Sequence, residues 1–241
     1  MYATDTGGKP CRVRSHYWSD ADEEAAQAAC AAADAAFALF GRAIPCDYPF
    51  ALSQAVLERL PWLASVPDAG LRLAFGAESG NGWQRHEGNG APIYIARRTR
   101  LILRLPVERL EMARALSGST LAISGFPLSV GAASVLALSP ADTLYALHVA
   151  DESGDEEIFL ERTARAIEAL GVRRRKIMCG KSRRLATSQG TLHTRSVLVA
   201  GLAPRDSLAL LTNGIGIGRL LGCGIFVPYK RSDSPARTAW T

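Results

Sequence analysis

The stretch TLYALHVADESGDEEIFLERTARAIEALG, residues 143–171, predicts a strand followed by a helix. Its first eight residues form the strand, and residues 156–171 form a helix that ends at Gly171 in the C′ position. A hairpin around a basic turn is predicted next, formed by KIMCG and LHTRSVLVAGL. A helix that begins at Pro204 and a strand over 224–230 follow it. The resulting order, β-α-β-β-α-β, predicts a ferredoxin-like domain.

The preceding part of the chain repeats this order. Pro49 and Pro106 each open a predicted helix, and the predicted strands around them are FALFGRAI, LRLAF, PIYIA, RLILRL, TLAISG and LSVG. We therefore expect an α+β protein of two tandem ferredoxin-like (RRM-like) domains, over residues 37–140 and 141–241, with a C-terminal glycine-rich loop. Residues 1–36 are expected to form an extension, in which the alanine-rich run DADEEAAQAACAAADAA predicts a helix.

Charge is distributed unequally between the two halves. Residues 171–241 hold thirteen Lys or Arg and only two acids, a net charge of +11, whereas residues 1–170 carry −6. Such polarity favours a polyanionic partner, of which nucleic acid is the commonest. A well-solvated basic face is the alternative that the composition leaves open.

The five cysteines are scattered and form no CxxC pair. This pattern is typical of reduced thiols in a cytoplasmic protein and predicts neither a disulfide framework nor a metal site. No apolar run is long enough to span a bilayer, and the N-terminus lacks the apolar region of a secretory signal, so no membrane partner is expected.

The glycine-rich stretch NGIGIGRLLGCGIF, residues 213–226, does not match a nucleotide-binding motif. In the two frames of G-x-G-x-x-G the third glycine falls at Arg219 or at Leu221, and the P-loop pattern is absent. A helix also precedes the loop and a strand follows it, the reverse of the dinucleotide motif, so no nucleotide cofactor is expected. Two interpretations stay open: a tight turn into the last strand, or an anion-binding turn with Arg219 aimed at a phosphate and glycines at Gly214, Gly216, Gly218, Gly222 and Gly224.

Two basic runs are candidates for RNA contacts. The run RRRKIMCGKSRR carries seven cations in twelve residues, and ARRTRLILR supplies Arg97, Arg98 and Arg100 at the edge of a strand in the first domain. Arginine and lysine contacts to phosphates read the shape and charge of an RNA stem, whereas a solvated turn is the alternative. The predicted contacts are Arg97, Arg98, Arg100, Arg173, Arg174, Arg175, Lys176, Lys181, Arg183, Arg184 and Arg195.

Three stretches of the chain show a resemblance to a known family. They are the glycine-rich loop with its following strand, FALFGRAIPCDYPFALSQAVLERLPWL, and IARRTRLILRLPVERLEMARALSGSTLAISGFPLSVG. They resemble the CRISPR repeat-RNA processing endoribonucleases of the repeat-associated mysterious protein (RAMP) superfamily. The resemblance covers about residues 37–230 and is greatest to the myxan-type type I version or the related type IV processing subunit. It implies binding of a CRISPR repeat hairpin, metal-independent cleavage by 2′-OH attack, and retention of the guide RNA in an effector complex with other subunits.

The resemblance also implies a catalytic position, which differs in this chain. The family's IPxDH motif commonly ends in an acid/base histidine, whereas IPCDY places Tyr48 there. A free tyrosine titrates near ~10 and a histidine near ~6.5, so Tyr48 suits a proton donor better than a base. Three possibilities for catalysis stay open. Tyr48 acts together with Arg42, His16 takes the place of the histidine, or the protein binds the hairpin with little catalysis. For Tyr48 itself, the structural alternative is packing at the seam between the two domains. His148 is expected to be a core or sheet-face residue.

Overall fold

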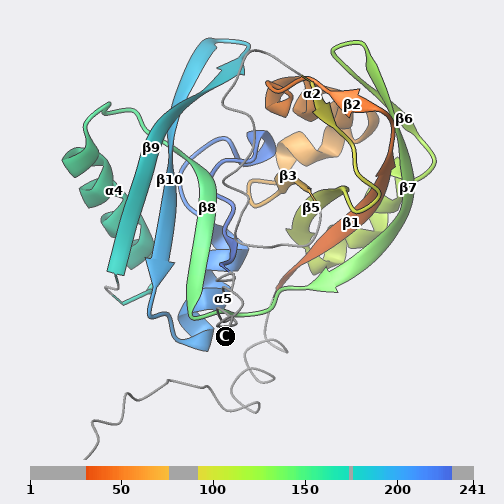
Figure 1. The fold of residues 1–241 in the computed structure, drawn as a ribbon. Coiled ribbons are helices and arrows are strands. Elements are labelled where there is room, and N and C mark those ends of the chain that lie inside the picture. Colours follow the sequence, from red (N-terminus) through yellow and green to blue (C-terminus); the bar gives the residue numbers. More distant parts are fainter. Residues whose placement is uncertain (1–30, 76–91, 174–175, 230–241) are drawn as a thin grey trace, which may run out of the picture.

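The computed structural model describes residues 31–75, 92–173 and 176–229, which form two α+β domains side by side (Figure 1). The first domain contains β1 (Ala32–Phe40), β2 (Ala43–Ile44), α2 (Pro49–Arg59), β3 (Gly70–Ala74), β4 (Ile93–Tyr94), β5 (Arg100–Pro106), α3 (Leu110–Ala113), β6 (Thr120–Ile123) and β7 (Phe126–Ala137). The second contains β8 (Thr143–Ala150), α4 (Glu156–Ala169), β9 (Lys176–Thr187), β10 (Gly190–Ala200), α5 (Pro204–Asn213) and β11 (Val227–Pro228). Short 3-10 turns cover Pro61–Ser65, Val107–Arg109, Arg114–Leu116 and Arg219–Leu221.

The sheet orders confirm the predicted tandem ferredoxin-like fold. The N-terminal sheet has the order β3-β5-β1-β7-β6, in which β6 adds a hairpin to the ferredoxin-like arrangement, and the C-terminal sheet has the order β11-β8-β10-β9. All of these pairings are antiparallel. The first strands of the two domains, β1 and β8, therefore lie in the interior of their sheets. The last strands of the β-α-β-β-α-β order, β7 and β11, pair with them, as that order requires.

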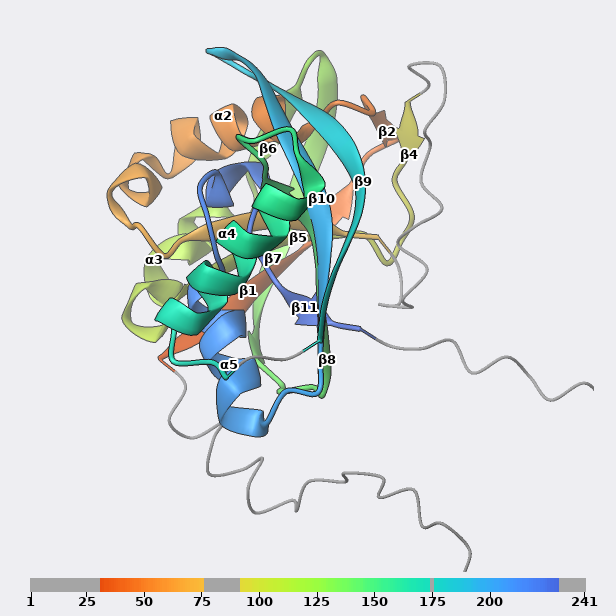
Figure 2. The same ribbon diagram turned by 90° about the vertical axis from the view of Figure 1, so that its left-hand side faces the viewer.

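Each sheet packs its own core. Phe37 and Leu103, from the two central strands of the first sheet, are fully buried with Val56 of α2. In the second domain Val197 and Val199 of β10 are buried with residues of α4 and α5, including Phe159, Ile167, Leu208 and Leu211. Figure 2 shows both of these helices on the same side of the C-terminal sheet. Its other face is directed toward the N-terminal domain, where the glycine-rich loop lies between the two sheets (Figure 1).

The helix predicted in the alanine-rich run is wrong in its last part. Residues 32–36 belong to β1, within the expected extension, whereas residues 20–30 lie outside the described residues. Helix propensity favours alanine by less than 1 kcal/mol per residue, and tertiary contacts readily outweigh it. In β1 the small side chains suit a strand that is covered on both faces, since Ala32–Phe37 are all buried.

The basic turn between β9 and β10 is also corrected. The cations of KIMCGKSRR lie within strand β9, and the turn falls at Ser188 and Gln189. Ile177 and Cys179 pack toward the core while Lys176 and Met178 are exposed. This alternation is that of a half-buried strand, which places the cations along the sheet instead of in its connection.

Candidate functional site

The glycine-rich loop is folded tightly upon itself. The Ile215 amide donates to the carbonyl of Gly224 (3.2 Å), and the Gly224 amide donates to the carbonyl of His148 on β8 (2.7 Å). The five predicted glycines all have left-handed backbones, with φ between 60° and 85°. A side chain on Gly224 would also collide with the Ile215 carbonyl. The loop is thus the tight turn into the last strand, and between Gly214 and Phe226 only its tip, Gly216 and Ile217, is exposed.

Arg219 is buried inside this turn, with 8% of its surface exposed. Its guanidinium donates to the main-chain carbonyls of Asn213, Thr212 (3.2 Å) and Asp68 (2.9 Å), the last of which belongs to the N-terminal domain. Burial, followed by the nearby charge of Arg104, lowers the pKa of Arg219 to about 10. These contacts correct the prediction that Arg219 is aimed at a phosphate: its donors hold the loop to the domain seam instead.

A second buried arginine reaches from the N-terminal domain to the C-terminal domain. Arg104 of β5 forms an ion pair with Asp34 of β1 (2.7 Å) and donates to the carbonyls of Leu211 (2.9 Å) and Phe226 (2.7 Å) in the C-terminal domain. Arg72 of β3 also contacts Asp34 (3.4 Å). Burial alone would raise the pKa of Asp34, but the charges and hydrogen bonds of the two arginines hold it below its ordinary value.

The two arginines share the last turn of α5. The final carbonyls of a helix have no partner within the helix, and cations are favourable there. Arg104 binds the Leu211 carbonyl and Arg219 binds those of Thr212 and Asn213. We call Asp34, Arg104 and Arg219 the seam cluster. It fastens α5 and the glycine-rich loop to the N-terminal sheet, and the sequence interpretation missed it. The available signal was Asp34, the one acid among the alanines of residues 31–36, and Arg104 within the strand RLILRL.

Tyr48 and the glycine-rich loop pack against the same core of the N-terminal domain. It stands directly before α2 and is half-buried, and its ring forms a T-shaped pair with Phe75 at a centroid distance of 6.0 Å. The 3-10 turn of the loop packs against α2 and β3, and its Leu220 packs on the same N-terminal core as Tyr48. Arg42 is exposed in the turn between β1 and β2, and His16 lies outside the described residues.

The predicted cations fall into two exposed groups. Arg97 and Arg98 are exposed in the turn before β5, where the Arg100 guanidinium donates to the carbonyls of Arg97 (2.8 Å) and Thr99 (2.9 Å). The second group follows α4 and runs along β9, with exposed Arg173, Lys176, Lys181 and Arg184 and half-buried Arg183. Arg174 and Arg175 lie outside the described residues.

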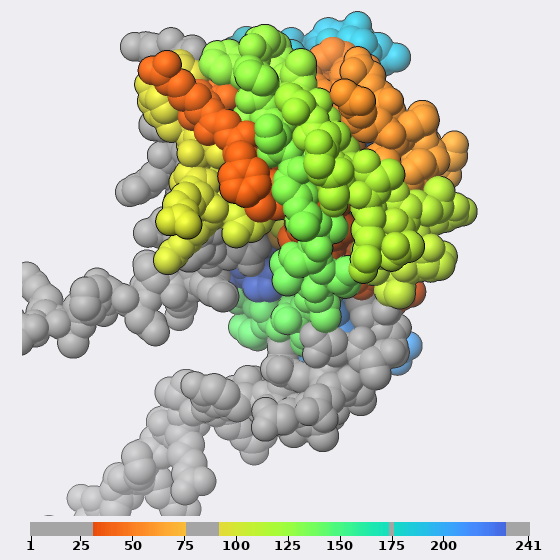
Figure 3. All heavy atoms as spheres, turned by 90° about the vertical axis from the view of Figure 1, so that its right-hand side faces the viewer, coloured from red at the N-terminus to blue at the C-terminus, as the bar shows by residue number. Residues whose placement is uncertain are grey.

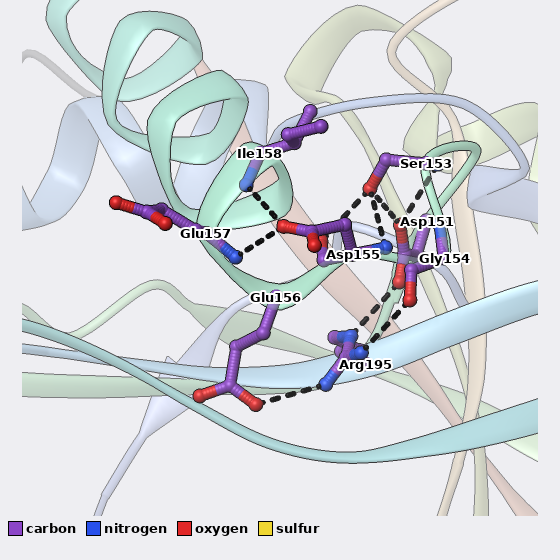
Figure 4. Close-up of polar contacts among 8 residues, drawn as sticks. All are labelled: Asp151, Ser153, Gly154, Asp155, Glu156, Glu157, Ile158 and Arg195. Carbon is purple, nitrogen blue, oxygen red and sulfur yellow. Dashed lines mark hydrogen bonds and ion pairs between the residues drawn. The ribbon is translucent and has the colours of Figure 1, made fainter.

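Arg195 has a structural role that the sequence did not indicate. Its guanidinium pairs with Asp151 (2.8 Å) and Glu156 (3.2 Å), as Figure 4 shows. Asp151 also accepts from Ser153 and Gly154, while the neighbouring Asp155 caps α4 by accepting from two of its amides. Arg195 therefore joins β10 to the start of α4, and its assignment as an RNA contact is corrected, because its charge is compensated within the fold.

His148 lies on the sheet face that points away from α4. Its ring Nδ1 is 2.9 Å from the Thr194 hydroxyl, and Thr194 alternates along β10 with Arg195, which faces α4. Burial, followed by the positive charge of Arg183, lowers the pKa of His148 to about 4. This placement agrees with the expected sheet-face position, and it makes His148 neutral near pH 7.

Two sequence comparisons with known proteins point to the same family. The sequence model of the family described as Cas6 Crispr matches residues 33–231. A CRISPR-associated endonuclease Cas6 from Myxococcus xanthus (strain DK1622) is 31% identical over 200 residues, which cover 83% of this chain and 82% of that protein.

Two solved structures share the fold. A CRISPR associated protein Cas6 superposes with a TM-score of 0.56 at 13% identity, covering 83% of this chain and all of that one. A Cas6-related protein from Pyrococcus furiosus gives a TM-score of 0.54 at 14% identity, covering 81% and 97% of the two chains. Since the family match spans most of the chain, this protein belongs to the Cas6 family.

Proposed function

We propose that this protein is an endoribonuclease that binds the hairpin of a CRISPR repeat and cleaves precursor CRISPR RNA beside it without a metal ion. The observation that carries the proposal is the position of the cationic strand β9. Together with the glycine-rich loop it packs against α2, the helix that Tyr48 precedes. RNA held along β9 would therefore pass close to the candidate catalytic tyrosine.

The β9–β10 hairpin has the shape and charge for a duplex RNA partner. Pairing of β8 with β10 ends at Ala150 and Thr194, whereas β9 and β10 continue together from that point to Thr187 and Gly190. The hairpin therefore projects beyond the sheet. No acidic residue occurs over positions 169–205, so the positive charges of β9 have no acidic neighbour in this part of the sequence. Phosphate contacts by such cations provide sequence-independent affinity for an RNA stem.

The proposed chemistry is transesterification. The ribose 2′-oxygen attacks the adjacent phosphorus, the bond from phosphorus to the 5′-oxygen breaks, and a 2′,3′-cyclic phosphate and a 5′-hydroxyl result. The reaction needs in-line positioning, removal of the 2′-hydroxyl proton and a proton for the leaving oxygen. We assign to Tyr48 the donation of that second proton.

A second candidate function is hairpin binding with little catalysis. It is favoured by the tyrosine in the place of the family's histidine.

Cleavage in the presence of a chelator tests the proposal. We expect a repeat RNA to be cut in EDTA with a 5′-hydroxyl product, because the attacking and leaving oxygens need only proton transfer and positioning. A substrate with a 2′-deoxy nucleotide at the cut site should bind equally well and remain intact. Tight binding of the natural repeat without cutting would establish the holding function instead. Equal affinity for the repeat and for random RNA would contradict both.

The exposed cations of β9 are expected to account for much of the salt dependence. Each phosphate contact contributes about 0.7 to 0.9 to the slope of log affinity against log salt. Replacing Lys181 and Arg184 by glutamine should lower the slope of hairpin binding by about 1.4 to 1.8, measured by fluorescence anisotropy over a salt series. Arg114→Gln removes an exposed cation outside this strand and serves as the control. An unchanged slope in the double variant would mean that β9 does not contact phosphate.

Two further parts of the proposal rest on the sequence alone. Retention of the guide RNA within an effector complex, together with other subunits, is implied by the resemblance, and a cytoplasmic location is the expectation from the cysteines. Within the described ranges, no helix combines the length and the apolar character needed to cross a membrane.

A further inference from the structure

We propose that the outer end of the N-terminal sheet binds unpaired, single-stranded RNA, with bases stacking on Phe40. We call this surface the Phe40 face and define it by Phe40, Tyr94, Arg97, Arg98 and Arg100. The proposal rests on the proposed RNA-binding function and adds a second site to it, separate from the cationic strand β9.

Phe40 is exposed where the rest of its strand is buried. It is the last residue of β1 and has 62% of its surface exposed, whereas Ala32–Phe37 are buried on both faces. A Cβ atom added to Gly131 on β7 would lie 3.0 Å from the ring of Phe40 and 3.2 Å from Ala38. The absence of a side chain at Gly131 thus provides room for the ring at the sheet surface, and more than half of Phe40 remains open to a ligand.

Arginines adjoin this ring. Ala38 pairs directly with Arg100 across β1 and β5, and directly opposed residues of an antiparallel pair share one face. Phe40 lies two residues beyond Ala38, so it shares that face with Arg100. The two hydrogen bonds from the Arg100 guanidinium fix it over the turn that carries exposed Arg97 and Arg98.

Acidic side chains are scarce around the Phe40 face. The sequence has none between Glu87 and Glu108, and strand β7 carries no charged residue. Asp34 on β1 lies six residues before Phe40 and is buried in the ion pair with Arg104. The arginines of this face therefore complement an anionic partner.

A second exposed aromatic residue lies on the separate two-stranded sheet formed by β2 and β4. Tyr94 of β4 is 70% exposed and pairs with Ala43 of β2, which follows Phe40 by three residues. Figure 3 shows the exposed end of β1, in red-orange, between the green β7 and the yellow β4–β5 segment. Aromatic rings beside arginines are the usual means of binding single-stranded RNA, because every base offers a face for stacking and every nucleotide a phosphate. A duplex stem keeps its bases stacked internally, so the ligand that fits this face is unpaired.

Binding of a fluorescently labelled ten-nucleotide oligouridine tests the proposal. We expect Phe40→Ala to weaken binding about tenfold, the usual loss when one base-stacking ring is removed, and Phe40→Trp to retain it. Ile158→Ala is the matched control, since Ile158 is 48% exposed on α4 beside acidic Glu157 and Glu161. In a second comparison, Phe40→Ala should bind a repeat hairpin with flush ends normally and lose affinity only for one with an unpaired flank.

Each result decides between the two proposals. The Phe40 face is overturned as an RNA site if the wild-type protein shows no measurable affinity for oligouridine, or if wild type and Phe40→Ala bind it equally. A protein partner would then be the alternative occupant of this face. The proposed function then stands as long as the flush hairpin is still bound and cut. Failure of the wild-type protein to prefer the hairpin would instead overturn the proposed function. If Phe40→Ala does not fold, 4-thiouridine crosslinking to the wild-type protein decides: adducts at Phe40 or over 94–100 support the face, and adducts only elsewhere overturn it.

Discussion

Replacing Tyr48 by phenylalanine is expected to slow cleavage of the repeat RNA about 100-fold, the ordinary effect of losing a general acid or base. The substitution removes only the hydroxyl group. The ring, with its T-shaped pairing to Phe75 and its contact with the N-terminal core, is retained. Hairpin affinity should therefore stay unchanged, since the proposed binding cations lie on other elements.

Single-turnover cleavage at saturating protein, measured beside equilibrium binding, separates these two effects. Tyr229→Phe also removes one hydroxyl, from a half-buried ring that lies 6.3 Å from the ring of Tyr145, and it should cleave at the wild-type rate. Tyr48→His returns the residue type that the family motif carries and should cleave faster than Tyr48→Phe. If Tyr48→Phe cleaves as fast as wild type, Tyr48 is not the proton donor, and His16→Ala becomes the decisive variant.

Replacing Asp34 by alanine is expected to lower the free energy of unfolding by about 3–5 kcal/mol. The substitution leaves the buried Arg104 without its counter-charge, and removing one member of a buried ion pair is far more harmful than removing an exposed one. The measurement is urea unfolding followed by circular dichroism. Glu161→Ala breaks the exposed pair with Arg165 and should change stability by less than about 1 kcal/mol. A similarly small change for Asp34→Ala would contradict a structural role of the seam cluster.

The stability difference between wild type and Asp34→Ala should also depend on pH. The pKa of Asp34 is lowered in the folded protein, so the stabilisation that it contributes is complete above the ordinary aspartate pKa of about 4. That stabilisation is lost as the pH falls through the lowered value, because the protonated carboxyl no longer offsets Arg104. The difference should therefore be constant near neutral pH and should narrow only below about pH 4.

The predicted fold was largely correct because its signals are local. The strand and the helix within residues 143–171 follow from periodicity over a few turns and from a terminal glycine, which depend on neighbouring residues alone. The same holds for Pro49 and Pro204 at the starts of α2 and α5. Where the local preference was weak, as in the alanine run, burial on both sides of the sheet decided in favour of a strand.

The sequence alone determined the order of elements, the cationic character of β9 and the presence of a turn that only glycine permits. Only the tertiary structure decided what individual arginines do. Arg104 and Asp34 are 70 residues apart in the chain, and Arg219 reaches a carbonyl 151 residues away, so no local pattern contains these partners. A buried arginine and a phosphate-binding arginine have the same covalent structure. They differ in the carbonyls and carboxylates that surround them, and those neighbours are set by the packing of one domain against the other.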